Sequence, residues 1–475
     1  MNPITPPLKP GQKHVIVVGA GFAGLSAAKQ LCKHPGLHVT VVDQRNHHLF
    51  QPLLYQVATA GLNPSDIAVP IRSQFAGATN VSVHLGRVTE VNLREKWVGG
   101  EGDVRLRYDY LVLAGGAQHS YFGKPQWEEF APGLKTLEQA TEIRRRILRA
   151  FEEAENELDP QRQRALLNFV VVGAGPTGVE MAGAIADISR TVLVKDFRRI
   201  NPRDARVVLL EAGPRLLPSF SEKLGTHAGK DLQALGVEVR LGARVTGVDA
   251  EGVSLGEERI AARTVIWAAG VEAERLTRVL GVELDRAGRV KVEPDLSLPG
   301  FPDAFAVGDL AHVEIKGQLV PGVAPAAIQM GEAAARNVVA SISGRARAPF
   351  RYKDKGAMAT IGKHRAIAET GKLKLTGYPA WVAWLFVHIF YLIGFKNRAT
   401  VFTEWTWNYL FSRRGARLIT ERDWRLRPAL PAARPTAAPR IDTAGAPATV
   451  GQQPGERGVE GARGTDSPRV GPTWS

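Results

Sequence analysis

The sequence has almost no cysteine: one residue, Cys32, in a chain of 475. A single thiol excludes a disulfide-stabilised scaffold, a metal centre built from several thiolates and a redox centre of two thiols within the chain. The first residues also lack an apolar core and a twin-arginine pair, so no export signal is apparent. These absences predict a reducing, cytosol-facing location and no metal site.

Long apolar runs are equally scarce. The longest covers residues 380–395 and is interrupted only by His388. As a helix it would measure roughly 24 Å. Its 16 residues are fewer than the ~20 that crossing a bilayer requires. Lys372, Lys374 and Lys396 flank the run on both sides, so no charge asymmetry indicates a spanning orientation.

Positive charge gathers around this apolar run. The formal net charge is +14, and residues 351–425 hold fourteen Lys or Arg against five Asp or Glu. A nucleic-acid site would interleave basic residues with isolated aromatics, whereas here the positives flank an apolar block. The pattern favours an anionic lipid surface and no nucleic-acid partner. We expect two helices, at 380–395 and 401–417, lying in the membrane face, with a buried core or dimer helix as the alternative.

The overall composition is that of a globular protein. Hydrophobic residues make up 44% and charged residues 23% of the chain, and the length suggests two or three domains. Beyond Pro428 the character changes, with eight prolines in 48 residues and few large apolar side chains. This composition predicts a disordered tail over residues 426–475.

A nucleotide-binding unit opens the chain. Residues 14–19 predict a buried strand, GAGFAG (19–24) opens a helix, and a second strand at 37–43 ends in Asp43. Strand, GxGxxG, helix and terminal acid together indicate a dinucleotide site. Gly19 makes the tight turn, Gly21 lets the backbone approach a pyrophosphate and Gly24 permits close helix–strand packing. A purely structural turn is the alternative.

The same pattern recurs from residue 168. A predicted strand is followed by GAGPTG, with Gly173, Gly175 and Gly178, then by a helix and a strand at 205–211 that ends in Glu211. The 38 residues from Gly173 to Glu211 exceed what one unit needs, so we interpret the basic stretch 190–204 as an insertion. Two units predict two dinucleotides, as in a flavoprotein that uses a nicotinamide.

The remaining segments complete an α/β fold class with two Rossmann-like dinucleotide-binding domains, disulfide-reductase-like, and a C-terminal membrane-anchoring helical region. Strands are predicted at 107–116 and 262–270, and another at 305–311 carries the Gly308–Asp309 pair that closes an FAD site in such flavoproteins. The predicted FAD-binding domain is split and comprises residues 11–120 and 295–345. The predicted NADH-binding domain comprises residues 121–294 and includes a solvated connecting helix at 140–158. A membrane-association region is predicted at 346–425, and it begins with a small β-rich piece at 351–378.

Several segments resemble the type II, non-proton-pumping NADH:quinone oxidoreductases, over about residues 12–425. The dinucleotide motifs are common to many flavoprotein reductases, but FQPLLYQVATAGL (50–62), APAAIQ (324–329) and IGFKNR (393–398) are more specific to this family. The resemblance implies non-covalent FAD, NADH as donor, a membrane quinone as acceptor, and monotopic attachment at the cytoplasmic face of a bacterial inner membrane. It leaves a homodimer open.

The resemblance also implies cofactor-binding residues. Asp43 and Glu211 would hold the ribose hydroxyls of the two adenosines. Glu211 would repel a 2′-phosphate and so favour NADH over NADPH, although Arg215 works against this. The helix beginning near Pro325 would direct its positive end at flavin N1 and O2. The residues carried over for FAD are Gly19, Ala20, Gly21, Phe22, Ala23, Gly24, Asp43, Gln44, Val88, Gly308, Asp309, Ala326 and Ala327, and those for NADH are Gly173, Gly175, Gly178, Glu211, Ala269 and Gly270.

For the quinone step the resemblance implies Glu180 and Gln329. Glu180 is an acid on an otherwise apolar helix face, although related reductases with other acceptors carry a glutamate there too. Gln329 would hydrogen-bond a quinone carbonyl, but Pro325 replaces the first glutamine of the AQxAxQ form and leaves Gln329 alone. Lys396 would anchor anionic lipid or lie at the quinone entrance.

Other function classes fit less well. Sulfide:quinone oxidoreductases and disulfide reductases need cysteines beside the flavin, and only Cys32 exists. An NADH-dependent reductase of a ferredoxin- or rubredoxin-type partner would suit the basic surface but leaves the apolar block unexplained. A membrane-bound NADH-sensing flavoprotein without catalysis would have little use for both dinucleotide motifs.

Overall fold

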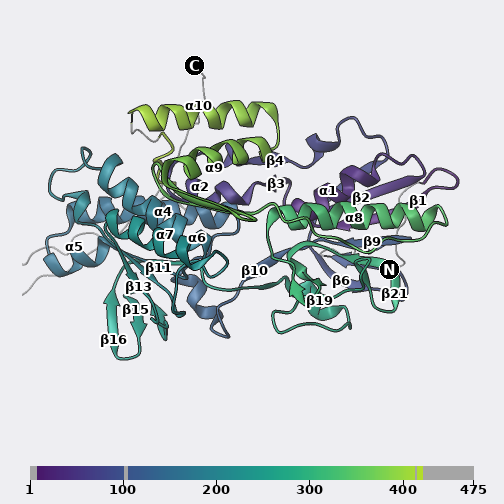
Figure 1. The fold of residues 1–475 in the computed structure, drawn as a ribbon, viewed down its shortest axis with the longest axis horizontal. Helices are drawn as coiled ribbons and strands as arrows, with labels where there is room; N and C mark the ends of the chain where they lie inside the picture. The colour runs from purple at the N-terminus through teal and green to yellow at the C-terminus, as the bar shows by residue number, and fades with distance from the viewer. Residues whose placement is uncertain (1–7, 101–104, 412–414, 421–475) are drawn as a thin grey trace, which may run out of the picture. The chain divides into compact units, whose positions relative to one another are not determined.

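Two parallel sheets organise the chain (Figure 1). The structure is a computed structural model that describes residues 8–100, 105–411 and 415–420. Five strands of the first sheet are parallel and one edge strand is antiparallel. In spatial order the strands are β20 (Ser297–Leu298), β21 (Phe301–Ala306), β9 (Tyr110–Leu113), β1 (Lys13–Val18), β2 (Leu37–Asp43) and β5 (Val81–Leu85).

The second sheet has four parallel strands. In spatial order they are β13 (Val237–Arg240), β12 (Arg206–Leu210), β11 (Asn168–Val172) and β17 (Thr264–Trp267). Val170 in the central strand lies between Val208 and Val265, and all three are buried. Nearly continuous apolar strands of this kind are typical of parallel sheets that helices cover on both faces.

Each sheet contains the predicted nucleotide-binding unit. Helix α1 (Phe22–Leu31) follows β1, and α6 (Pro176–Asp187) follows β11. The predicted α/β class with two Rossmann-like units is therefore confirmed. Cys32 lies just after the end of α1 as its C-terminal cap and is half-buried.

Residues from far along the chain complete the first sheet. Strand β21 pairs in parallel with β9, and α8 (Ala324–Ile342) packs along α1 (Figure 1). The two helices cross closely because residue 331 is glycine: a Cβ there would overlap the backbone carbonyl of Ala23. This arrangement is the one that a split FAD-binding domain requires, and the exact domain boundaries stay a prediction.

Helix α4 (Leu137–Asn156) corrects the expectation of a solvated connecting helix. Ile143, Ile147 and Phe151 are fully buried on one face, at the four-residue spacing that makes a helical stripe. Most of the charged residues that suggested solvation occupy the other face, where Glu142 pairs with Arg145 and its neighbour, whereas Arg144 is buried. The helix thus contributes to the core of the second domain.

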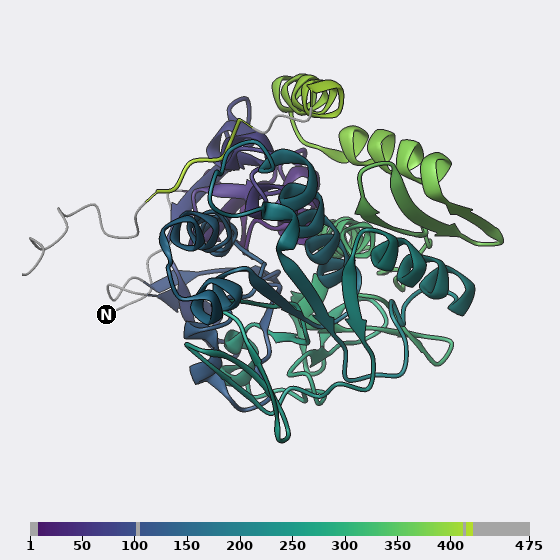
Figure 2. The ribbon, with the colours of Figure 1, turned by 90° about the vertical axis from the view of Figure 1, so that its left-hand side faces the viewer.

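The C-terminal region forms a separate layer over α6 (Figure 2). Strands β25 (Ala357–Gly362), β26 (Arg365–Thr370) and β27 (Leu373–Thr376) make a small antiparallel sheet, which α9 (Gly377–Tyr391) covers. Helix α10 (Phe395–Phe411) follows. The β-rich piece and two helices were predicted, whereas residues 412–414 and the predicted tail lie outside the described residues.

The close packing of β25 on α6 depends on one glycine. A Cβ at position 183 would overlap the backbone carbonyl of Ile361, so only glycine lets helix and strand approach to this distance. No helix in the described ranges has both the length and the apolar content needed to cross a bilayer.

One further strand pair lies at the site. Strand β10 (Ala117–His119) pairs with β18 (Val271–Ala273) and so joins the segments that follow the two sheets. The remaining regular elements are η1 (Gln51–Leu53), α2 (Leu54–Ala58), β3 (His47–Leu49), α3 (Pro64–Ile67), β4 (Ala68–Pro70), η2 (Arg72–Phe75), β6 (Val88–Asn92), β7 (Trp97–Gly100), β8 (Arg105–Arg107), η3 (Pro125–Glu129), α5 (Pro160–Leu166), η4 (Ile188–Val192), η5 (Pro202–Asp204), α7 (Glu222–Ala234), β14 (Gly247–Asp249), β15 (Gly252–Leu255), β16 (Glu258–Ala261), η6 (Arg275–Val279), β19 (Val290–Lys291), η7 (Gly308–Leu310), β22 (Ala311–His312), β23 (Glu314–Ile315) and β24 (Gln318–Leu319).

Candidate active site

The first glycine loop has two packed glycines and one open glycine. Gly19 adopts φ = +93°, and a Cβ there would overlap the carbonyl of Ala114 in the next strand. A Cβ at Gly24 would overlap the carbonyl of Gly19, so this residue holds helix α1 against the loop. At Gly21, by contrast, a Cβ would meet no atom within 4 Å. The open space in front of Gly21 suits a pyrophosphate bound at the helix N-terminus.

The second loop repeats this arrangement. Gly173 adopts φ = +101° against the backbone of Ala268 and its neighbour, and a Cβ at Gly178 would overlap the carbonyl of Gly173. The space in front of Gly175 is open, as at Gly21. The two loops therefore present the same cradle, one to each dinucleotide.

The acid at the end of β2 bonds to the backbone of its own loop. Asp43 accepts hydrogen bonds from the backbone N–H groups of Ala20, at 2.6 Å, and Arg45, at 2.7 Å. Burial raises the pKa of Asp43, and these two hydrogen bonds work in the opposite direction. Each carboxylate oxygen keeps a second lone pair for a ribose hydroxyl.

The acid at the end of β12 does the same in the second unit. Glu211 accepts from the backbone N–H groups of Ala174 and Gly213, each at 2.7 Å. It thus fixes the loop that would surround the nicotinamide dinucleotide and still offers acceptor sites. Ala269 and Gly270 follow directly after β17, and Gly270 has a positive φ with the ring of Phe122 packed against it.

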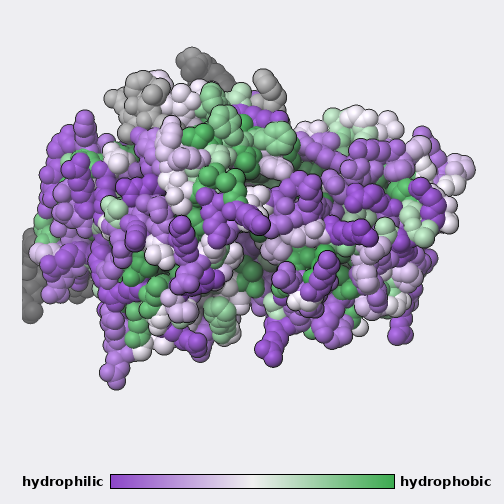
Figure 3. Space-filling model, viewed as in Figure 1, coloured by the Kyte–Doolittle hydropathy of each residue, from purple (hydrophilic) through white to green (hydrophobic). Residues whose placement is uncertain are grey.

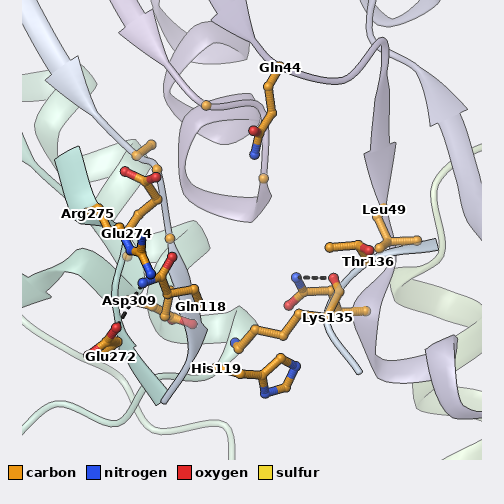
Figure 4. Close-up of a pocket in the computed structure, with 18 of the residues that line it drawn as sticks. Gln44, Leu49, Gln118, His119, Lys135, Thr136, Glu272, Glu274, Arg275 and Asp309 are labelled. Atoms are coloured by element: carbon orange, nitrogen blue, oxygen red, sulfur yellow. Dashed lines mark hydrogen bonds between the residues drawn. The ribbon is translucent and has the colours of Figure 1, made fainter. Parts of the chain in front are cut away.

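A groove of about 590 Å³ runs from the first loop across the carboxyl end of the first sheet (Figure 4). Gln44 points into it from one wall, while Glu272, Glu274 and Arg275 line the facing wall. Ten of the predicted FAD residues line this groove: Gly19, Ala20, Gly21, Phe22, Ala23, Asp43, Gln44, Gly308, Asp309 and Ala327. An elongated groove that begins at an open glycine cradle fits a dinucleotide.

Three predicted FAD residues do not line the groove. Gly24 packs against Gly19, and Ala326 is buried on the inner face of α8. Val88 lies in strand β6 and is half-buried in a separate small sheet. Val88 packs against the core of the first sheet, and its predicted contact with FAD stays a prediction.

The sequence analysis missed the basic side chains of the groove. Arg45, Arg87, Lys135, Arg275 and Arg278 all line it, and such charges suit the phosphates of a dinucleotide. Arg87 is held by Glu274 at 3.3 Å. These residues come from separate loops with no shared motif, so no local signal marked them.

A second cavity, of about 980 Å³, adjoins the groove and extends to helix α9. Phe22, Gln51, His119, Lys135, Asp309 and Ala327 line both spaces. At the far end the cavity is bounded by Ala383, Val387, His388 and Tyr391 of α9. Most of the wall between is apolar, contributed by side chains such as Phe50, Phe220 and Leu375. The cavity therefore connects the flavin end of the groove with the C-terminal helices.

Glu180 lines this cavity from α6, as a half-buried side chain. Burial raises the pKa of its carboxyl to about 8, and a hydrogen bond from the Thr360 backbone acts in the opposite direction. At neutral pH the group is therefore protonated and able to donate a proton. A perturbed acid facing a cavity is a common feature of functional sites.

Two histidines of the cavity stay neutral. Burial lowers the pKa of His388 to about 4, and its Nδ1 donates to the carbonyl of Trp384 at 2.7 Å. Burial and the nearby Lys135 lower the pKa of His119 to about 4 as well, and Lys135 extends across the pocket toward it (Figure 4). The break that His388 makes in the apolar run was a visible signal, whereas nothing local marked His119.

Gln329 does not fit the role predicted for it. It lies outside the cavity, because helical phase turns it away from Ala327 and Ile328, which line the wall. Its amide donates to the backbone carbonyl of Lys353 and accepts from the Lys353 N–H, each at 2.9 Å. Both ends of the side chain are thus used to hold the start of the C-terminal region. Pro325, which replaces the other glutamine, does line the cavity.

The outer surfaces of α9 and α10 are apolar and open to solvent. Phe386 is 65% and Phe390 69% exposed, and Phe402 and Trp407 of α10 are exposed as well. Figure 3 shows a hydrophobic area over these helices, among largely hydrophilic surroundings. Lys396 lies exposed at the start of α10 and does not line the cavity. In the part of the chain that the structure describes, no cluster of His, Cys, Asp or Glu is arranged to hold a metal ion.

Comparisons with known proteins agree with this geometry. Residues 13–331 match the family described as pyridine nucleotide-disulphide oxidoreductase, and residues 355–414 match the NDH2 C-terminal domain. The chain is 46% identical to the type II NADH:quinone oxidoreductase Ndh of Mycobacterium tuberculosis, over 88% of this chain and 92% of that protein. It is 44% identical to NdhA of the same organism, over 86% and 90%. NDH2 from Plasmodium falciparum, solved in complex with NADH, has the same fold, with a TM-score of 0.77, 20% identity, and coverage of 86% and 100%.

The first prediction concerns the open glycine of the first loop. Gly21→Val should lower FAD affinity by about tenfold or more, because a branched side chain would occupy the pyrophosphate space. FAD content after gel filtration measures the effect. Gly36→Val is the matched control, since a Cβ at the exposed Gly36 also meets no atom within 4 Å but the residue does not line the groove. A folded Gly21→Val protein with full flavin content would contradict the assignment.

The second prediction concerns Glu211. Glu211→Gln should raise the ratio of kcat/KM for NADPH over NADH by several-fold to about tenfold, because a carboxylate no longer repels the 2′-phosphate. The amide also leaves the N–H of Ala174 or Gly213 without an acceptor, so Tm should fall. Glu238→Gln is the control: it removes a carboxylate from β13 that pairs with Arg206 and Arg240. An unchanged donor ratio in Glu211→Gln would refute the role.

Proposed function

Since this chain belongs to the type II NADH:quinone oxidoreductases, we propose that the groove and the adjoining cavity hold the two half-reactions of that enzyme. The enzyme is FAD-dependent, takes its electrons from NADH and reduces a quinone. One observation carries the proposal: the cavity runs from the flavin end of the groove, past Glu180, to α9.

The two loops supply the binding of the dinucleotides. The first loop and the N-terminus of α1 hold FAD, with the open space at Gly21 receiving its pyrophosphate. The second loop and Glu211 hold NADH, and Pro176 and Thr177 bring it to the cavity wall. When bound, FAD accepts a hydride from NADH and passes two electrons on to the quinone.

Helix α8 contributes an oriented positive end. Its first residues, Ala324 and Pro325, line the cavity together with Ala327. Small side chains leave the helix N-terminus accessible, and its dipole stabilises negative charge that develops nearby. Lys135 adds a full positive charge where groove and cavity meet.

Glu180 supplies a proton to the quinone. A quinone that receives two electrons must also take up two protons. One arrives with the hydride that NADH supplies, and a neutral carboxyl facing the cavity is a suitable donor of the other. The apolar walls beside it exclude water and suit the ring of a quinone. Gln329 is not part of this proposal, because its amide is engaged with Lys353.

The C-terminal region attaches the enzyme to the membrane as a peripheral protein. The exposed side chains of α9 and α10 enter the lipid face, and the basic residues of 351–425 contact anionic headgroups. Quinone then reaches the cavity from the lipid, where α9 forms its wall. We propose the cytoplasmic face as the side of attachment, while a homodimer stays a prediction.

A protein electron acceptor fits this geometry less well. A ferredoxin- or rubredoxin-type partner would need a docking surface beside the flavin, whereas the space there is a mainly apolar cavity that leads to α9. The exposed apolar surface of α9 and α10 would also have no purpose in such a protein.

The third prediction separates the two half-reactions. In anaerobic stopped-flow measurements, Glu180→Gln should leave reduction by NADH unchanged and slow reoxidation by quinone by about a hundredfold, the usual worth of a general acid. In the parent enzyme reoxidation should slow above about pH 8, where the pKa of Glu180 lies. Glu332→Gln, on α8 but outside the cavity, is the control. Equal reoxidation in both variants would refute the assignment.

The pKa of Glu180 also predicts a stability effect with a defined sign. Because the folded-state pKa is raised from 4.5 to about 8, the unfolded chain releases this proton first as pH rises. The free energy of unfolding should therefore fall between pH 4.5 and 8. Glu180→Gln, which does not titrate, should show a flatter pH dependence of Tm over this window.

The fourth prediction concerns attachment. Phe386→Ser combined with Phe390→Ser should weaken sedimentation with anionic lipid vesicles by about tenfold or more, since each exposed phenyl ring contributes on the order of 1.5 kcal/mol or more when buried. Leu158→Ser, at an exposed leucine between α4 and α5, should have no effect. High salt alone should release little protein. Unchanged sedimentation of the double variant would show that this surface does not enter the lipid.

A further inference from the structure

The family-specific segment FQPLLYQ ends in helix α2, whose residues the proposed function has not yet used. Tyr55 of α2 lines the cavity, and Gln56 lies beside it between the second domain and α10. Both side chains are polar and are placed among apolar neighbours. Buried polar groups of this kind are held by hydrogen bonds, and their partners show what they connect.

The partners form a chain of side-chain hydrogen bonds from α10 to Thr360, whose backbone lies beside the cavity acid. The indole Nε1 of Trp405 lies 2.7 Å from Oε1 of Gln56. Nε2 of Gln56 lies 3.0 Å from the hydroxyl of Tyr55, which lies 2.9 Å from Oγ1 of Thr360. The backbone of Thr360 then hydrogen-bonds the carboxyl of Glu180.

The direction of this chain is fixed at its first member. An indole N–H can only donate, so Gln56 must present its carbonyl oxygen to Trp405 and its NH₂ group to Tyr55. The hydroxyl of Tyr55 then accepts from Gln56, and either Tyr55 or Thr360 donates the hydrogen bond between their two hydroxyls.

The chain is enclosed by packing. Trp405 is 3%, Tyr55 7% and Thr360 4% exposed, and hydrogen bonds in such surroundings polarise one another and resist exchange with water. Gly183 brings β25 onto α6, and this contact places Thr360 against Glu180. The five groups are thus held by four separate parts of the chain: α10, α2, β25 and α6.

We infer that α10 positions the proton-donating carboxyl of Glu180 through Trp405, Gln56, Tyr55 and Thr360, so that seating of α10 in the membrane tunes the quinone half-reaction. This inference rests on the role proposed above for Glu180. Trp405, Gln56 and Tyr55 are positioning residues, because they act on the acid through Thr360.

The direction of the effect follows from the hydrogen bonds. A donor aimed at a carboxyl favours its charged form, so the backbone of Thr360 holds the pKa of Glu180 lower than burial alone would. The side-chain bonds from α10 hold Thr360 in this position. Breaking the chain should raise that pKa further. The other titratable groups that line the cavity are the same in every variant below: Lys135, His119, His388, Asp309, Asp354, Lys355, Glu369, Tyr352 and Tyr391.

The experiment compares two tryptophans. Trp405→Phe removes the first donor and keeps an aromatic ring. Trp384→Phe is the matched control: its ring lies 5.3 Å from that of Trp405, it is also buried, and its indole nitrogen has no hydrogen-bond partner among the described residues. Both changes remove the same atoms, but only one breaks the chain.

Infrared spectroscopy of the FAD-loaded enzyme provides a readout independent of turnover. The carboxyl band that Glu180→Gln abolishes belongs to Glu180, and its pH titration gives the pKa directly. The midpoint should rise by about half to one pH unit in Trp405→Phe and stay in place in Trp384→Phe. Reoxidation by quinone should show the same shift in its pH profile, while reduction by NADH should not change.

Tyr55→Phe is the second variant, in case Trp405→Phe folds poorly. It keeps the ring and removes the central hydroxyl, so it should shift the midpoint in the same direction. Equal midpoints in the parent, Trp405→Phe and Tyr55→Phe would overturn the inference, as would equal shifts in Trp405→Phe and Trp384→Phe. If Glu180→Gln leaves reoxidation by quinone unchanged, the proposed function of Glu180 fails instead, whatever the tryptophan variants show.

Discussion

The contact between α6 and β25 is the constraint on which the active site depends. The carbonyl of Ile361 lies where a side chain at position 183 would have to stand, so the helix and the strand approach to backbone distance. Helix α6 begins at the second nucleotide loop and carries Glu180 one turn later. Pressing β25 onto this helix encloses the acid, raises its pKa and fixes the C-terminal helices beside it. Helix α6 thus supports the second nucleotide loop, the acid Glu180 and the C-terminal region that packs on it.

The two nucleotide loops show how one physical solution serves twice. In each, a glycine with positive φ turns the chain, a second packs the helix, and a third leaves a space. In each, the acid at the end of the next strand accepts two backbone N–H groups, as Asp43 and Glu211 do. The acids therefore shape the loops before any ribose is bound. The functional difference between the sites arises outside the loops, from the basic groove on one side and the apolar cavity on the other.

The sequence predicted those parts of the structure whose signals are local. Both glycine motifs, their flanking strands and the acid on α6 lie within short segments, so spacing was enough to find them. Lys135 and Tyr55 reach the cavity from separate loops and helices, and no spacing rule brings such residues together. The direction of the Gln329 side chain could not be predicted from the motif, because one step along a helix rotates a side chain by about 100°. In the structure this side chain points toward Lys353. The spacing of Ile143, Ile147 and Phe151 indicated a buried face on α4, but the alternating charges of the helix led to the prediction of a solvated helix.

The order of segments along the chain has a consequence for biosynthesis. Residues that form the second sheet are contiguous, whereas the first sheet waits for β21 and α8, which are translated after them. Domains fold as they leave the ribosome, beginning from the N-terminus. The second sheet can therefore fold while the first sheet is still missing β20, β21 and the helix α8 that packs beside it. Strand β25, which packs on α6 beside Glu180, is translated later still, and helices α9 and α10 follow it. The active site is therefore complete only once α9 and α10, the last described helices of the chain, have also been translated.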